Sequence, residues 1–187
     1  MITGCYPGSF NPPTIAHLAI AEAARRQCDL GRLDLVVSRV ALGKEIAEVP
    51  RFEDRLAVLD AVAHSRPWLA VRVTDAKLLV DVAQGYDLLV VGADKWAQLH
   101  DPAWYGGSDA ARDDALERLP DVVVAPRPPW PVPPERALVG IDPAHLAVSA
   151  TGARNDQRHW MAPEAADFDA RTGAWTDPAR YRRWVDR

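Results

Sequence analysis

The sequence has few cysteines and no long apolar runs. Its 187 residues include only Cys5 and Cys28, without a CxxC pair or a Cys/His ligand spacing around them. This argues against a disulfide scaffold or a zinc module, so we expect free thiols in a reducing compartment. The longest strongly apolar runs, such as Leu88–Ala93, are as long as a strand and far shorter than a membrane span. No signal-peptide pattern opens the sequence, and we therefore expect a cytoplasmic protein with no membrane partner.

Positive charge is also scarce. There are 22 Lys and Arg residues against 26 Asp and Glu, which gives a formal net charge of −4 and a pI near 5.7. Because no basic excess is available to neutralise many phosphates, nucleic acid is not expected as a partner. A small phosphorylated ligand held by a few local donors remains compatible with this composition. Only three of the basic residues are lysines, namely Lys44, Lys77 and Lys95.

Apolar runs of strand length alternate with segments of helical period. The predicted strands are Met1–Tyr6, Leu33–Val40, Leu69–Thr74, Asp87–Val91 and Asp121–Ala125, with a weaker sixth at Ala144–Ser149. The predicted helices are His17–Gln27, Phe52–Ala63, Ala76–Gln84 and Ser108–Leu119. This alternation predicts an α/β fold, a doubly wound (Rossmann-like) parallel sheet of five to six strands with helices on both faces. Ligands of such sheets bind beyond the carboxyl ends of the strands, where the strand order reverses.

One segment whose residues are suited to ligand binding joins the first predicted strand to the first predicted helix. It reads Tyr-Pro-Gly-Ser-Phe-Asn-Pro-Pro-Thr-Ile-Ala-His from Tyr6 to His17. Gly8 allows a sharp turn and the close approach of a ligand. Thr14 suits a helix N-cap, and the free N–H groups of a helix N-terminus bind phosphate. From local physics alone, a tight turn followed by a surface histidine explains the segment equally well.

Two further segments carry polar groups at the ends of predicted strands. Val148–Arg154 offers the hydroxyls of Ser149 and Thr151 and the guanidinium of Arg154, although a routine helix cap followed by a surface arginine would look the same. The other runs from Val90 to Trp104, and Trp104 fits base stacking and ordinary packing equally well.

Together these segments resemble the nucleotidyltransferases with a (H/T)xGH motif. Gly8–His17 is similar to their GxFxPxxxxH signature, with Ala16 where the family usually has glycine, and Val148–Arg154 is similar to their SxTxxR signature. The Gly-Ala-Asp of residues 92–94, with Trp104 and the segment Asp121–Arg127, resembles the GAD…W…VVxR block of the nicotinate/nicotinamide mononucleotide adenylyltransferases. Chance co-occurrence in the family's order is much less expected than any single match.

The resemblance implies an enzyme that transfers the AMP moiety of ATP to a phosphorylated acceptor, with nicotinate or nicotinamide mononucleotide favoured, and that releases pyrophosphate. Mg²⁺ is implied as a companion of ATP, with no dedicated metal site on the protein. The implied catalytic residues are His17, Thr14, Lys44 and Arg154. The implied ATP-binding residues are Gly8, Ser9, Phe10, His17, Gly92, Asp94, Ser149, Thr151 and Arg154. The implied acceptor-binding residues are Lys44, Trp104 and Arg127.

The resemblance also divides the chain. Residues 1–160 are expected to form the nucleotidyltransferase domain, and residues 161–187 a C-terminal extension packed on it. The extension fits either a cover or a contact between copies in a homo-oligomer.

Several alternatives stay open. Residues 74–85 lack the Tyr/Trp-Thr segment usual in the mononucleotide enzymes and are somewhat similar to the matching segment of the phosphopantetheine adenylyltransferases. Ala16 and Gly152 are compatible with a catalytically weak relative that binds a nucleotide as a sensor. A cytidylyltransferase is disfavoured because no RTxGISTS-type signature is present.

Overall fold

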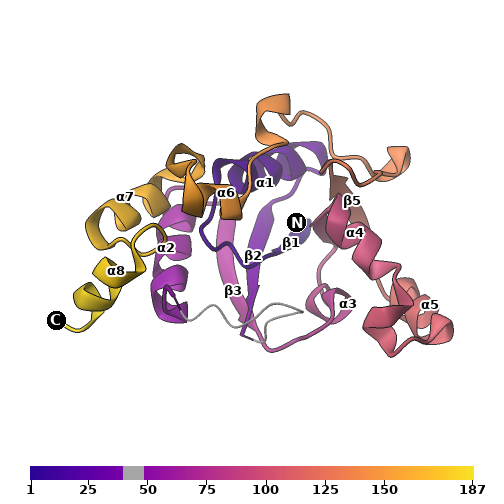
Figure 1. The fold of residues 1–187 in the computed structure, drawn as a ribbon. Coiled ribbons are helices and arrows are strands. Elements are labelled where there is room, and N and C mark those ends of the chain that lie inside the picture. Colours follow the sequence, from indigo (N-terminus) through magenta and orange to yellow (C-terminus); the bar gives the residue numbers. More distant parts are fainter. Residues whose placement is uncertain (40–48) are drawn as a thin grey trace.

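The computed structural model describes residues 1–39 and 49–187. Five parallel strands form one sheet in the order β3-β2-β1-β4-β5 (Figure 1). The strands are β1 Thr3–Pro7, β2 Arg32–Ser38, β3 Leu69–Thr74, β4 Leu88–Gly92 and β5 Asp121–Ala125. The prediction of a doubly wound α/β fold is confirmed, with five strands.

Helices cover both faces of this sheet. They are α1 Ile15–Gln27, α2 Phe52–His64, α3 Leu79–Val82, α4 Ala93–Leu99, α5 Asp109–Glu117, α6 Ala150–Asn155, α7 Pro163–Thr172 and α8 Pro178–Val185. Short 3₁₀ turns are η1 Pro102–Tyr105, η2 Pro134–Arg136, η3 Pro143–His145 and η4 Arg158–Trp160. Figure 1 shows α7 and α8 beside α2 at one side of the molecule, and α4 and α5 at the other.

The period-two alternation of the strands divides the core into two layers. On β2, Leu35 packs with α1 and α2, whereas the next residue, Val36, packs with α3 and α4. Both neighbours are almost fully buried, as expected for a strand that is covered on both faces.

Two predicted elements differ from the structure. The predicted strand Ala144–Ser149 is wrong, because Pro143 opens η3 and the side chain of Asp142 accepts a hydrogen bond of 2.8 Å from the Ala144 amide. The predicted helix Ala76–Gln84 shortens to α3. There the hydroxyl of Thr74 accepts from the Ala76 amide at 3.1 Å, which favours a turn over a helical start.

The reversal of strand order lies between β1 and β4. All five strands are parallel, so the loops after β1, β4 and β5 leave the sheet at one edge, its carboxyl edge. This geometry concentrates the predicted site residues there. Within residues 1–39 and 49–187, no helix combines the length and the apolar character needed to cross a membrane.

Candidate active site

The loop after β1, residues 8–14 (the first loop), is fixed by its own packing. The Gly8 amide donates to the Val36 carbonyl at 3.0 Å, which ties the loop to β2. The Phe10 ring is almost completely buried and packs edge-on against Tyr6 at 5.5 Å and against His17 at 5.0 Å. A Cβ at position 8 would lie 2.8 Å from the Phe10 ring, so the loop requires glycine there.

Thr14 and His17 cap the start of α1 reciprocally. The Thr14 hydroxyl accepts from the His17 amide at 3.3 Å, and Nδ1 of His17 accepts from the Thr14 amide at 3.0 Å. This is the arrangement of a capping box, in which histidine replaces the usual Glu or Gln. An Nδ1 atom that accepts from an amide carries no proton, so the ring proton of neutral His17 resides on Nε2 as a hydrogen-bond donor.

The surroundings of His17 favour a neutral imidazole. Burial, assisted by the positive charge of Arg127, lowers the pKa of His17 to about 4. Burial also raises the pKa of the Tyr6 hydroxyl, an effect that Arg127 opposes and Asp94 reinforces. Near neutral pH the site therefore presents an uncharged N–H donor at His17, with Arg127 as a nearby source of positive charge.

The loops after β4 and β5 supply this nearby charge. Gly92 is the N-cap of α4, and Nε of Arg127 lies 3.7 Å from Oδ1 of Asp94. A Cβ at Gly92 would come within 2.7 Å of the same carboxylate oxygen. The structure thus brings the predicted residues Gly92, Asp94 and Arg127 to the carboxyl edge, where the charge of Arg127 acts on His17.

The second signature meets the first. Ser149 caps α6 by accepting from the Gly152 amide at 3.0 Å. The Arg154 guanidinium donates to the Asn11 carbonyl of the first loop and to the Thr151 hydroxyl, the latter at 3.2 Å. Figure 1 shows α6 beside α1 accordingly. Two segments far apart in the sequence therefore form one surface, on which the side chains of Ser9 and Thr151 are exposed.

Two predicted site residues are not placed in this cluster. Trp104 lies in η1 and lines a small hollow with Leu79 of α3 and Gln98 of α4, so the structure groups it with those helices rather than with His17. Lys44 lies outside the described residues.

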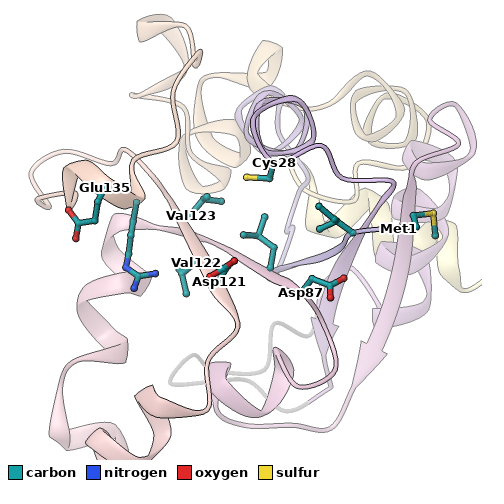
Figure 2. A pocket seen from close by; sticks show the side chains of 10 residues that line it. Met1, Cys28, Asp87, Asp121, Val122, Val123 and Glu135 are labelled. Carbon is teal, nitrogen blue, oxygen red and sulfur yellow. The ribbon is translucent and has the colours of Figure 1, made fainter.

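A cavity of about 750 Å³ opens at the opposite, amino edge of the sheet. Asp87 and Asp121 line it at the starts of β4 and β5, with Met1 at the other side (Figure 2). None of the predicted site residues is among its lining residues. We therefore locate the candidate active site by the converging loops and not by cavity size.

Sequence reasoning missed two residues that the structure joins to the site. The indole Nε1 of Trp175 donates to Oδ1 of Asn11 at 2.6 Å, and both side chains are buried. Asn11 lies inside the first signature, but no local pattern connects it to a tryptophan in the C-terminal extension.

The segments that converge at the carboxyl edge lie within a region that matches a known protein family. A family model described as cytidylyltransferase-like matches residues 5–156. The chain belongs to the cytidylyltransferase-like family. The sequence-based prediction of a nucleotidyltransferase is therefore confirmed, and the matched region contains both signature segments of this cytidylyltransferase-like protein.

Individual relatives carry a narrower name. A Listeria innocua protein named "Probable nicotinate-nucleotide adenylyltransferase" is 26% identical over 172 residues, which cover 83% of this chain and 86% of the relative. A Coprothermobacter proteolyticus protein with the same name is 27% identical over 165 residues, which cover 81% of this chain and 80% of the relative. These relatives support the expectation of an enzyme of the adenylyltransferase kind.

Solved structures share the fold. Nicotinic acid mononucleotide adenylyltransferase of Plasmodium falciparum superposes with a TM-score of 0.66 in its complex with NaAD and 0.64 in its complex with APC. Each match covers 94% of this chain and 98% of the other, at 14% and 13% identity respectively. At such identity the likeness concerns the fold.

Proposed function

We propose that this cytidylyltransferase-like protein transfers the AMP moiety of ATP to nicotinate or nicotinamide mononucleotide and releases pyrophosphate. The observation that carries the proposal is the reciprocal cap of Thr14 and His17, which leaves an Nε2–H donor at the strand-order reversal. The names of the relatives from Listeria and Coprothermobacter support the choice of acceptor.

The proposed reaction is an in-line displacement. An oxygen of the acceptor's phosphate attacks the α-phosphorus of ATP, the new P–O bond forms, and the bond to pyrophosphate breaks. Such transfers depend on positioning and on neutralising charge, and they need no covalent protein nucleophile. The Nε2–H of His17 donates to a phosphate oxygen, and the free amides at the start of α1 add their dipoles.

Cationic groups complete the proposed phosphate site. Arg154 uses two donors for Asn11 and Thr151, which leaves the rest of its guanidinium for phosphate oxygens. Lys44 is proposed to contribute a further positive charge to the phosphates. Mg²⁺ would arrive with ATP and neutralise phosphate charge; in residues 1–39 and 49–187, no group of three His, Cys, Asp or Glu side chains could hold it independently.

The acceptor is proposed to lie toward β4 and β5. Gly92 and Asp94 would border the nucleotide. Arg127 would bind the acceptor's phosphate after giving up its ion pair with Asp94. Stacking by Trp104 on the pyridine ring stays a prediction, and it would require the acceptor to extend toward η1.

A second acceptor, phosphopantetheine, has a specific observation in its favour. The segment between β3 and β4 contains only the four-residue α3, and residues 74–85 lack the Tyr/Trp-Thr segment usual in the mononucleotide enzymes. The chemistry at the α-phosphorus would be the same with either acceptor.

A side-by-side assay tests the proposal. The protein is incubated with ATP and Mg²⁺ and, in parallel, with nicotinate mononucleotide, nicotinamide mononucleotide or phosphopantetheine. Pyrophosphate is quantified, and the dinucleotide or dephospho-coenzyme product is identified by mass spectrometry. We expect turnover with a pyridine mononucleotide. Tight ATP binding without release of pyrophosphate from ATP in the presence of any acceptor would instead favour a nucleotide sensor.

A further inference from the structure

Asn11 is held from both sides by segments from the end of the chain. Its side-chain oxygen accepts the 2.6 Å hydrogen bond from the Trp175 indole, and its main-chain carbonyl accepts from the Arg154 guanidinium. Asn11 is 8% exposed and Trp175 is 4% exposed, so water cannot readily replace the indole donor. This contact spans 164 residues of sequence.

The indole is itself held in place. Oδ1 of the buried Asp169 accepts from the main-chain amides of Trp175 at 2.7 Å and Thr176 at 3.0 Å, while Oδ2 accepts from the Thr176 hydroxyl at 2.6 Å. The Trp175 ring also packs edge-on against Phe168 at 6.0 Å. A fully satisfied buried carboxylate of this kind fixes the backbone that carries the indole.

The first loop needs such support. Phe10, the residue before Asn11, has a φ of 43°, in the left-handed region that a bulky side chain rarely adopts. Such a conformation persists only where the surroundings enforce it. Because Asn11 follows directly, fixing both of its polar groups fixes the direction in which the Phe10 ring meets His17.

A second tie from the extension supports the end of the same loop. The Ala162 amide donates to the Pro13 carbonyl at 2.9 Å, and Met161 forms an isolated bridge with Thr14. The start of the extension and its Trp175 therefore both contact the segment that leads into the cap of α1.

We propose that Trp175 is a positioning residue of the nucleotidyl-transfer site: through Asn11 it holds the first loop in the shape that places His17 against the nucleotide phosphates. The effect on turnover rests on the proposed function, whereas the effect on the shape of the first loop does not. The C-terminal extension is thereby a working part of the site and not only a cover.

The test uses the full-length chain and three variants. Trp175→Phe removes the N–H donor and keeps an aromatic ring. Adding Asn11→Leu to it removes both hydrogen-bonding partners, so no buried polar group is left unsatisfied and stability should largely return. Trp184→Phe is the matched control, because Trp184 lies on α8 in the same extension, is 39% exposed, and packs edge-on against Phe168 as Trp175 does.

Two measurements are made on each variant. Steady-state kinetics give kcat and KM separately, and hydrogen exchange without any ligand reports on the amides of Gly8 and His17. We expect Trp175→Phe to lower kcat/KM by about ten- to a hundredfold, mainly through kcat, since a misplacement of the reacting groups has effects of this size. Exchange at Gly8 and His17 should accelerate by about tenfold or more, while Trp184→Phe should leave both measurements unchanged.

The double variant separates positioning from stability. If Trp175 only stabilised the fold, activity would return together with the unfolding midpoint; we expect the midpoint to recover while kcat/KM stays low. Unchanged exchange at Gly8 and His17 in Trp175→Phe would overturn the inference. Absence of turnover in the unaltered protein would count against the proposed function alone, because the exchange result is still read without any ligand.

Discussion

The double role of His17 leads to a prediction in which stability and catalysis separate. Nδ1 accepts from the Thr14 amide as part of the helix cap, and Nε2–H faces the proposed phosphates. A glutamine at position 17 can reach back to the Thr14 amide as in the common capping box, but its terminal NH2 group is not part of a rigid ring and does not hold an N–H in the fixed direction of Nε2–H. Alanine loses both interactions.

The magnitudes follow from these two contacts. Removing one preorganised donor to a developing oxyanion lowers kcat by about 10²- to 10³-fold, so His17→Gln and His17→Ala should both fall in that range. Losing a helix cap costs about 1 kcal/mol of stability, so only His17→Ala should unfold measurably earlier. The two variants should therefore differ in stability and agree in activity.

The assay combines pyrophosphate release at saturating substrates with urea unfolding of the same preparations. Thr14→Ser serves as the control, because serine keeps the hydroxyl that caps α1. If His17→Gln retained more than about a third of the unaltered kcat, the assignment of Nε2–H as the catalytic donor would be refuted. If His17→Gln and His17→Ala were equally stable, the reciprocal cap would have no energetic role.

Three further predictions concern charge and packing at the same edge. The pKa of His17 is about 4 in the folded protein and 6.5 for an unperturbed histidine, so the unfolded state binds more protons between these pH values. The free energy of unfolding should therefore fall as the pH drops through this window, by roughly 2 kcal/mol between pH 7 and pH 5. Urea unfolding at each pH should show a smaller decrease in His17→Gln. Arg127→Gln should raise the pKa of His17, because Arg127 lowers it, and an NMR titration that left this pKa unmoved would contradict the arrangement. Gly152→Ala would place a Cβ 2.5 Å from the Trp160 ring, so we expect a loss of about 1–3 kcal/mol in chemical denaturation.

The architecture was predictable because periodicity is a local signal. Apolar runs such as Leu88–Val91 reveal buried parallel strands directly, and their alternation with helices determines the doubly wound order. The false strand at residues 144–149 shows the limit of this signal. A short apolar run cannot be told from a turn when Pro143 and Asp142 form a 3₁₀ cap just before it.

The candidate site was predictable only in part. Spacing within the first signature brings Thr14 and His17 together, because residues three apart meet in the first helical turn. Which nitrogen of His17 carries the proton could not be predicted, since it depends on the hydrogen bond to the Thr14 amide. The contact of Asn11 with Trp175 could not be predicted from the sequence, because residues 164 positions apart are not linked by any helix or strand periodicity.

The hydrogen bond between Asn11 and Trp175 has a consequence for synthesis of the protein. The ribosome adds about 5–20 residues per second, so Asn11 waits roughly ten to thirty seconds for a partner 164 residues later. A nascent chain can pair all five strands by Ala125, yet it still lacks the residue that completes the first loop. On our proposal, the nascent chain does not reach full nucleotide-transfer activity until Trp175 has emerged from the ribosome and bonded to Asn11.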